Sequence, residues 1–279
     1  MSLVTLADVL QPALKQGYAV AGVVCLGWED MRAFVEAAEL ERAPLVLQAG
    51  PGCREHTPLP VLAKMFRHLA ENASVPVVAH LDHGYSIEDC REAIAEGFTS
   101  VMFDGSKKPL RENIDETAAI VAMAHGAGVS CEGEIGFVGY ADGAESSGTD
   151  PAEAAQFARE TGVDAMAISV GNVHLQQNQE GKLDEARIRA IASVTDAPLV
   201  IHGGSGVPPF QRLSLATGSR VCKFNIGTEF RMVSGNALRL AVNKDPARFD
   251  RISILKETHL PVMEATRLVL RGLGSSGRA

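Results

Sequence analysis

The most informative stretch for the fold is VAHLDHGYS, residues 78–86, where an apolar run suited to a buried strand ends in three ionisable side chains. They belong to His80, Asp82 and His83. Burying such a group costs roughly a few kcal/mol unless it is hydrogen-bonded, paired with a charge or bound to a metal. We therefore expect other parts of the chain to supply partners for this cluster.

Seven further runs resemble this one in being short, apolar and rich in β-branched residues. They read YAVAGVV, APLVLQAG, TSVMFDGS, VSCEGEIG, AMAISVGN, APLVIHGG and RVCKFNIG. The segments between them have helical periodicity, among them 29–41, 58–73, 86–97, 151–162 and 184–194. Strand and helix alternate eight times, and the 279 residues suit one barrel. The pattern predicts a single (β/α)8 TIM barrel domain over residues 1–279.

Four segments fall outside this alternation. Residues 5–16 have helical periodicity and are expected to close the bottom of the barrel, and the helical segment 253–274 is expected to pack outside it or against a partner subunit. Residues 137–150 are rich in Gly, Ser and Asp and are expected to form a mobile active-site loop. The tail, 274–279, is expected to be flexible.

The composition of the chain indicates which partners and which cellular compartment to expect. The net charge is −8 without a concentrated stripe of Lys and Arg, which argues against nucleic acid. The five cysteines are scattered without a CxxC pair, as expected for reduced thiols in the cytoplasm. We find neither a signal peptide nor an apolar run long enough to cross a bilayer, and we expect a cytoplasmic protein without a membrane partner.

Histidines follow three of the predicted strands. His83, His174 and His202 would meet at one rim, because the carboxyl ends of barrel strands converge there. A single histidine is more often a satisfied structural residue than a ligand. Three imidazoles from three strands could bind a zinc-type ion and leave a position open for substrate. Together they therefore predict a catalytic metal site.

Two glycine-containing motifs predict an anion site on the same rim. HGGSG, residues 202–206, follows the seventh predicted strand, and NIGTE, residues 225–229, ends the eighth. Their backbone N–H groups are unobstructed, and helices are predicted to follow them. Phosphate sites of barrels commonly lie at these two positions, where helix N-termini favour anions.

With these residues in place, the chain resembles the class II, metal-dependent ketose-bisphosphate aldolases, which include fructose-bisphosphate and tagatose-bisphosphate aldolases. The resemblance spans residues 17–229 and is carried by HLDHG, SVMFDGS, EGEIG, TDPAEAAQFARETGVDAMAISVG, PLVIHGGSGVP and VCKFNIGTE. It implies a metal-dependent aldolase that cleaves or forms a ketose phosphate. It also implies a homodimer or homotetramer.

The resemblance assigns roles to individual residues. His83, His174 and His202 would hold the catalytic Zn²⁺, and Asp104 and Glu134 would form a second or alternative metal position. Asp82 would act as acid and base on the C4 hydroxyl of the substrate. The substrate phosphate would bind to Gly203, Gly204, Ser205, Asn225, Ile226, Gly227 and Thr228. A monovalent cation is a further implied cofactor.

Departures from the family pattern fall on substrate positions. Val24 and Gly27 stand where the family carries asparagines, and Gly50 replaces a Ser or Thr. Leu175 replaces a glycine after His174, and the lid carboxylate is at best Asp142. Because unpaired polar groups of a ligand cost about 1–3 kcal/mol each, these changes predict a substrate other than fructose 1,6-bisphosphate.

Three alternatives use the same residues differently. Lys223 has the parity of Asn225 in its strand and could form a Schiff base, although a lysine paired with acidic groups inside the barrel explains the same pattern. An open zinc site could also hydrolyse esters or amides. Finally, the changed pocket would suit a non-catalytic barrel that binds a metal or a sugar phosphate.

Overall fold

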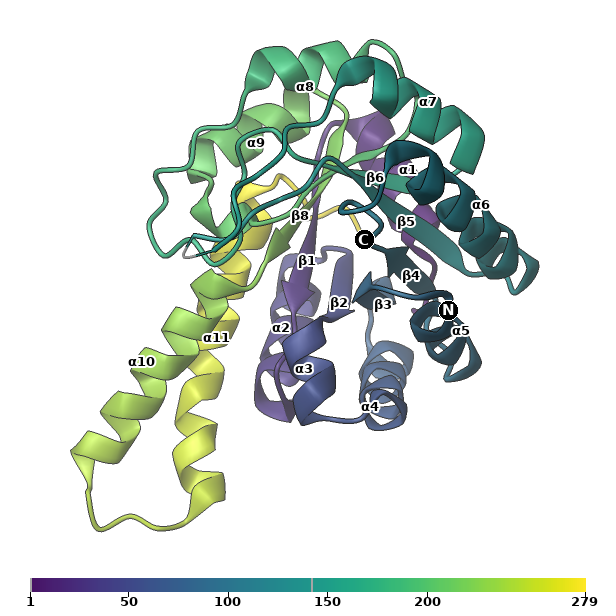
Figure 1. Cartoon of the computed structure of the whole chain (residues 1–279). Helices are drawn as coiled ribbons and strands as arrows, with labels where there is room; N and C mark the ends of the chain where they lie inside the picture. The colour runs from purple at the N-terminus through teal and green to yellow at the C-terminus, as the bar shows by residue number, and fades with distance from the viewer. Residues whose placement is uncertain (1, 142) are drawn as a thin grey trace.

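The computed structural model describes residues 2–141 and 143–279 and contains a closed barrel of parallel strands, as predicted (Figure 1). The strands follow one another around the barrel in sequence order. They are β1 (Val20–Val24), β2 (Leu45–Ala49), β3 (Val77–Gly84), β4 (Ser100–Phe103), β5 (Ser130–Ile135), β6 (Ala165–Ile168), β7 (Leu199–Ile201) and β8 (Val221–Ile226). Each corresponds to one of the eight apolar runs.

Helices surround the barrel and extend it at both ends. In chain order they are α1 (Leu6–Gln16), α2 (Trp28–Glu41), α3 (Pro51–His56), α4 (Leu59–Asn72), α5 (Ile87–Ala95), α6 (Leu110–Gly126), α7 (Pro151–Thr161), α8 (Glu185–Ala192), the 3-10 turn η1 (Gly204–Gly206), α9 (Pro209–Gly218), α10 (Thr228–Lys244) and α11 (Arg251–Gly272). The predicted helical segments agree with them to within a few residues.

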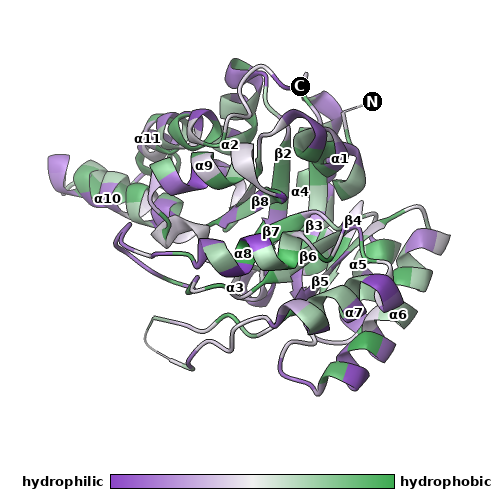
Figure 2. Cartoon of the chain, turned by 90° about the horizontal axis from the view of Figure 1, so that it is seen from above, coloured by the Kyte–Doolittle hydropathy of each residue, from purple (hydrophilic) through white to green (hydrophobic). Residues whose placement is uncertain are grey.

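Alternation along the strands separates the apolar core from the polar barrel interior. In β8, Phe224 and Ile226 belong to the core between the barrel and the helices, while Lys223 and Asn225 contact other residues inside the barrel. A second apolar cluster fills the bottom of the barrel, where Leu6 and Leu10 of α1 are fully buried. As predicted, α1 therefore closes this end. The apolar strands are the green centre of Figure 2.

A bulge in β3 breaks the alternation beside the site. The pairing of β3 with β4 shifts register between Leu81 and Gly84, and His83 has a positive φ of 53°. Successive residues of a regular strand point to opposite faces. The bulge turns His83 so that both it and Asp82 face the upper end of the barrel.

Helices α10 and α11 form a hairpin that projects from the barrel (Figure 1). Its root is fixed on α2, where the Glu41 carboxylate accepts from Arg267 at 2.8 Å and from Arg271 at 2.6 Å. The tail after α11 is also held there. The N–H of Gly277 donates to Glu41 O and that of Ala279 to Arg42 O, both at 2.8 Å.

Residues 274–279 are thus hydrogen-bonded to neighbouring segments, while the flexibility expected of this tail stays a prediction. Its short, small-residue sequence resembles a loose terminus, but Ser275 is completely buried. The Ser275 hydroxyl donates to the carbonyl of Leu270 at 2.9 Å. These partners lie on α2 and α11, and only the tertiary structure brings them to the tail.

The loop 137–150 is hydrogen-bonded to the segment that carries His174. Phe137 and Ser147 exchange two backbone hydrogen bonds of 2.8 Å. The N–H of His174 donates to Gly139 O at 2.8 Å, and the N–H of Ala141 donates to His174 O at 3.0 Å. The loop thus lies at the candidate site, as predicted, while its mobility stays a prediction.

None of the described helices is both long and apolar enough to cross a lipid bilayer.

Candidate functional site

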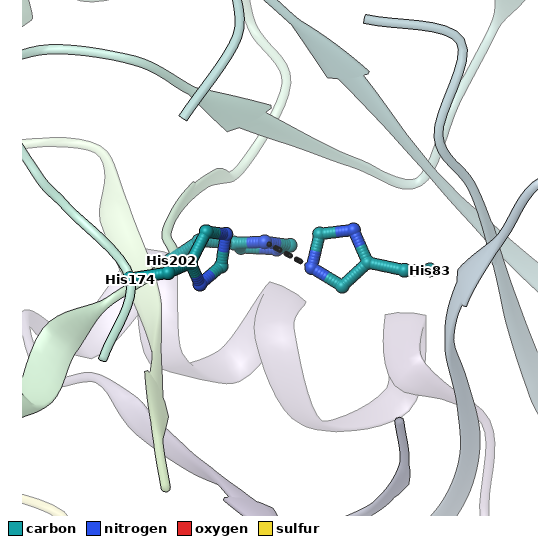
Figure 3. A group of neighbouring side chains, drawn as sticks. All are labelled: His83, His174 and His202. Atoms are coloured by element: carbon teal, nitrogen blue, oxygen red, sulfur yellow. Dashed lines mark hydrogen bonds between the residues drawn. The ribbon is translucent and has the colours of Figure 1, made fainter. Parts of the chain in front are cut away.

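Three imidazoles meet at the upper end of the barrel, each delivered by a different strand (Figure 3). His83 lies on β3, His174 follows β6 and His202 follows β7. His83 Nε2 and His202 Nδ1 are 3.1 Å apart, and one nitrogen of each of the three rings lies within 4.8 Å of the others. The structure therefore brings together the three histidines that the sequence predicts as metal ligands.

Carboxylates orient two of these rings. Asp104 Oδ2 is 2.8 Å from His83 Nδ1, and Glu132 Oε1 is 3.0 Å from His202 Nε2. Each ring is left with its other nitrogen facing the space between the histidines. Metal-binding histidines commonly have their second nitrogen held in this way. Asp104 thus holds the His83 ring, and His83, Asp104 and Glu134 also form a second group whose possible ligand atoms lie within 4.8 Å of one another.

Glu134 provides a further test of whether the residues fit a metal ion. Its Oε2 atom is buried and has no hydrogen-bond partner among the described residues, although it lies 3.5 Å from His202 Nδ1. A buried carboxylate oxygen without a donor is costly unless a cation satisfies it. Three nitrogens and one unpartnered oxygen match the ligand set that Zn²⁺ prefers. The residues therefore fit a zinc ion.

Burial and the neighbouring charges set the protonation of these groups. Burial disfavours a charged His83, but Asp82, Asp104 and Glu134 outweigh it and raise the pKa to about 9. Burial and the two other imidazoles lower the pKa of His174 to about 3. Burial followed by the charge of Asp104 raises the pKa of Glu134 well above its usual range. The charge of each of these groups therefore affects the protonation of its neighbours.

A layer of charges lies beneath the histidines. Lys223 Nζ donates to Glu132 Oε2 at 2.7 Å, and both side chains are completely buried. His80 Nδ1 lies 2.8 Å from Ser100 Oγ, and His80 Nε2 is 3.9 Å from Glu132. Glu132 thus joins His202 to the buried lysine. The sequence alone does not indicate this role of Glu132, because only the placement of β5 and β8 around the barrel reveals its partners.

Asp82 is held by two amides. Its Oδ1 atom accepts from Gln48 Nε2 at 3.1 Å and from Asn225 Nδ2 at 3.3 Å. Its Oδ2 atom faces the space above Gly50, where an added Cβ would lie 3.3 Å away. Burial acts to raise the pKa of Asp82, but the neighbouring His83 and His202 lower it overall. One carboxylate oxygen is therefore fixed while the other faces the cavity.

A cavity of about 270 Å³ opens above the metal-ligand candidates. Five of the seven residues predicted to bind phosphate line it, namely Gly203, Ser205, Asn225, Gly227 and Thr228. The Ser205 hydroxyl accepts from the N–H of Gly227 at 3.1 Å and that of Glu229 at 3.2 Å, which ties η1 to the first turn of α10.

Two of the predicted phosphate residues do not line the cavity. Ile226 points outward into the core, because strand alternation places it opposite to Asn225. Gly204 lies against β8, where an added Cβ would be 3.0 Å from Asn225 O. The side chain of Ile226 is therefore excluded from substrate contact.

The departures from the family pattern occupy different places. Val24, Gly50 and Leu175 line the cavity, but Gly27 does not. Gly27 instead precedes α2, and its N–H donates to Asp30 at 2.8 Å. Leu175 has a φ of 61°, in the left-handed region that favours glycine. The backbone at position 175 thus has a conformation suited to the glycine of the family pattern, although a leucine side chain lines the cavity there.

Asp142, the predicted lid carboxylate, lies outside the described residues. Its neighbour Tyr140 lines the cavity and packs on His174 with ring centroids 5.0 Å apart. Sequence reasoning missed Tyr85, Tyr140 and Arg231, which also line the cavity. Arg231 had a detectable signal, since it follows Thr228 by three residues and so shares one helix face. Tyr85 had one as well, since it directly follows β3, two residues after His83, whereas Tyr140 lies in the loop 137–150 and had none.

Known proteins resemble the chain over its full length. The family described as Fructose-bisphosphate aldolase class-II matches residues 4–278. The fructose-bisphosphate aldolase of Staphylococcus epidermidis is 35% identical over 288 residues, with 100% of both chains covered. That of Geobacillus stearothermophilus is 36% identical over 286 residues, covering 100% of this chain and 99% of its own. The YdjI aldolase structure from Escherichia coli is 28% identical, with a TM-score of 0.86 and 99% of each chain covered.

These matches agree with the barrel, the histidine cluster and the adjoining cavity, and they show that the chain belongs to the class II fructose-bisphosphate aldolase family and is an aldolase, a carbon–carbon lyase.

Proposed function

We propose that the enzyme cleaves and forms a ketose phosphate other than fructose 1,6-bisphosphate by a zinc-dependent aldol reaction. The observation that carries this proposal is the convergence of three imidazoles beside Asp82 at the floor of one cavity. The replaced substrate positions Val24, Gly50 and Leu175 support a changed substrate, because all three line that cavity.

The metal would be held by His83, His174 and His202, with Glu134 as an additional or alternative ligand. When bound, a zinc ion supplies a Lewis acid that polarises a carbonyl group. Asp104 and Glu132 fix two of the three rings so that their free nitrogens face each other. We also propose a second metal position at Asp104 and Glu134 and a monovalent cation. Both are implied by the resemblance to the family.

Asp82 would move the proton of the C4 hydroxyl. Its Oδ2 atom faces the cavity, while Gln48 and Asn225 hold Oδ1. In cleavage, Oδ2 accepts the proton of the C4 hydroxyl and the C4–O bond becomes the carbonyl of the aldehyde half. The C3–C4 bond breaks, its electron pair forms the C2=C3 bond, and the C2 oxygen takes the negative charge. The aldehyde half then leaves, and C3 gains a proton as the ketone half forms. The proton donor at C3 is proposed to be Asp142.

The phosphate of the ketone half would bind where η1 meets α10. Ser205, Gly227 and Thr228 line the cavity there. The first N–H groups of an α-helix lack intrahelical partners and carry partial positive charge, and the Ser205 hydroxyl already accepts from two of the N–H groups around the start of α10. This arrangement would fix the phosphate while the carbonyl end reaches the histidines.

The Schiff-base alternative has little support. Lys223 is buried beneath the histidines and donates to Glu132, so its amine does not face the cavity. Borohydride reduction in the presence of substrate should therefore leave the enzyme active.

We also propose that the chain forms a homodimer or homotetramer in the cytoplasm. Exposed apolar side chains on the α10–α11 hairpin, such as Leu240, Phe249 and Ile252, support an interface with a second copy. The five cysteines are buried and free, which fits a reducing compartment.

A retro-aldol assay tests the function. Ketose mono- and bisphosphates are offered to untreated, chelated and zinc-restored protein, and triose phosphate is detected. We expect cleavage that is lost on chelation and regained with zinc. The proposal would be refuted if protein that is shown to be zinc-loaded cleaves none of the substrates. It would also be refuted if chelated protein of confirmed low metal content is as active as the untreated protein.

A further inference from the structure

Arg54, in the last turn of the short helix α3, reaches back onto the ends of two barrel strands. Its Nη1 atom donates to Ala49 O of β2 at 2.7 Å and to Asp82 O of β3 at 2.6 Å, and its Nη2 atom donates to His83 O at 3.0 Å. The hydrogen bonds of this guanidinium group thus all end on backbone carbonyls. Two of these carbonyls belong to the proposed base and to a proposed metal ligand.

The bulge of β3 explains why these carbonyls need a donor. The pairing of β2 with β3 ends at Ala49 and Leu81, and the pairing of β3 with β4 shifts register between Leu81 and Gly84. Asp82 and His83 therefore lie outside the regular ladder on both sides, and only 5% and 7% of their surface is exposed. Buried backbone carbonyls are almost always hydrogen-bonded. Among the described side chains, the guanidinium group alone donates to these two carbonyls.

The two carbonyls flank the residue with the unusual backbone. Because peptide groups are planar, the direction of Asp82 O fixes the peptide group before the Cα atom of His83, and the direction of His83 O fixes the one after it. Together these two peptide groups set the φ and ψ angles of His83, including its positive φ of 53°. A non-glycine residue keeps such a conformation only where its surroundings hold it. The guanidinium group contacts both carbonyls and so holds this conformation directly.

Arg54 approaches the bulge from the side away from the substrate cavity. It is not among the described residues that line that cavity, and it instead lines a separate cavity of about 260 Å³ together with Leu81 of β3 and Asp89 of α5. Leu81 belongs to the apolar core between the barrel and the helices. An effect of Arg54 on catalysis must therefore pass through the two residues of the bulge.

We propose that Arg54 is a positioning residue, which fixes both peptide groups beside His83 and thereby keeps Asp82 and His83 turned toward the cavity together. In a regular strand neighbouring side chains point to opposite faces, so without the bulge one of the two would leave the site. The planar fork of arginine can hold two separate carbonyls at once, whereas the ammonium group of lysine is a single point charge. This inference rests on the proposed function, in which Asp82 is the base and His83 binds zinc.

Zinc affinity and kinetics test the inference together. Arg54→Met and Arg54→Lys are compared with wild type, and Arg67→Met, which breaks an exposed ion pair with Glu71 on α4, is the matched control. Competition with a chromophoric chelator measures the zinc dissociation constant, which we expect to rise roughly 10–100-fold in both Arg54 variants. At saturating zinc, kcat for ketose phosphate cleavage should fall at least about tenfold, while KM changes less than about threefold. The control should leave all three constants unchanged.

The outcomes separate the inference from the proposed function. If wild type binds zinc and Arg54→Met keeps both the zinc affinity and kcat, the inference is wrong and the proposed function stands. A rise in KM alone would also overturn the inference, because it would assign Arg54 to substrate binding. Failure of the wild type itself to bind zinc would instead refute the proposed function, and the inference with it.

Chemical rescue keeps the test valid if the variants are less stable. Arg54→Ala removes a side chain that lines the cavity beside Leu81, so guanidinium ion from solution can reach the two carbonyls. Below its denaturing range, guanidinium chloride should restore part of the lost kcat relative to sodium chloride of the same ionic strength, and it should not restore Asp82→Asn. A variant that is only destabilised would lose activity instead, because guanidinium favours the unfolded chain. Absence of rescue in Arg54→Ala that retains its native circular dichroism would overturn the inference.

Discussion

At the scale of single residues, two residues of the site have a backbone in the left-handed conformation. His83 and Leu175 have φ values of 53° and 61°. For His83 this conformation belongs to the bulge of β3, which lets neighbouring residues, Asp82 and His83, both reach the cavity floor. Strained residues of this kind persist where the surrounding structure fixes them, and they gather at functional sites.

Asp82→Asn tests the proposed base. Asparagine retains an oxygen that can accept from Gln48 and Asn225, but it cannot take a proton from the substrate hydroxyl. We expect kcat/KM to fall by about 10²–10⁴, the usual contribution of general base catalysis, with the zinc content unchanged. A loss smaller than about threefold in fully zinc-loaded protein would assign the proton transfer to another group.

Leu175→Gly tests whether the Leu175 side chain contributes to substrate binding without contributing to the stability of the fold. Left-handed backbone costs a non-glycine residue about 1–2 kcal/mol, and relief of this strain offsets the packing that the half-exposed side chain provides. We expect the free energy of unfolding to change by less than about 1 kcal/mol in urea titrations. The control Leu213→Gly, at an exposed position in α9, should lose about 1 kcal/mol. Equal destabilisation of both variants would contradict the argument.

At the scale of elements, the barrel rim is assembled by loops and helix ends that fasten to one another. The loop 137–150 exchanges backbone hydrogen bonds with the segment carrying His174, and the Ser205 hydroxyl ties η1 to α10. On the outer side, Glu41 joins α2 to α11 and the chain end. Each contact joins segments that are distant in sequence, so the elements position one another.

Glu41→Gln tests the fastening of the α10–α11 hairpin. Hydrogen bonds from Arg271, opposed by burial and reinforced by Arg267, lower the pKa of Glu41 to about 2. A carboxylate whose pKa is lower in the folded state stabilises the protein above its unfolded pKa, and this contribution is lost as the pH falls toward the folded value. The variant should therefore be less stable at pH 7 by about 1–2 kcal/mol.

The difference between wild type and Glu41→Gln should shrink as the pH falls below about 4.5, because Glu41 is then protonated in the unfolded chain while the folded protein still holds it ionised. Urea unfolding at pH 7 and near pH 3 measures it. Glu264→Gln, which removes only the more exposed partner of Arg267, should have little effect at either pH. A pH-independent difference for Glu41→Gln would assign the loss to packing.

At the scale of the whole molecule, metal binding and assembly should both affect stability. The histidine cluster joins β3 to the segments that follow β6 and β7, and the hairpin of α10 and α11 projects beyond the barrel (Figure 1). Phe249 is 94% exposed and Ile252 is 65% exposed. Exposed apolar surface of this kind marks contact sites in stable proteins.

Zinc removal should lower the thermal midpoint. An ion that binds only the folded chain stabilises it by about 2.7 kcal/mol at a hundredfold excess over its dissociation constant, which corresponds to roughly 5–10 °C for a chain of this size. Differential scanning fluorimetry of chelated and zinc-restored protein measures the shift, and His83→Ala should abolish it. A midpoint that zinc leaves unchanged in the wild type would argue against the metal site.

Phe249→Asp should dissociate the oligomer. A carboxylate placed in an apolar contact between two copies is desolvated without a partner, and light scattering after gel filtration would then report the monomer mass. Val194→Asp introduces the same charge at another exposed apolar position, which follows α8 on the barrel, and should keep the assembly. A wild-type mass equal to one chain would refute the oligomer itself.

The amino-acid sequence by itself determined the barrel, because apolar runs at regular spacing specify strands and periodic segments specify helices, and both signals are local. It also indicated His83, His174 and His202, since polar residues at strand ends converge in any parallel barrel. The tertiary structure alone decided how these groups interact: the bulge that turns His83, the pairing of Lys223 with Glu132, the tail held on α2, and the tyrosines and Arg231 in the cavity. These features depend on contacts between distant segments, whose geometry leaves no periodic pattern in the sequence.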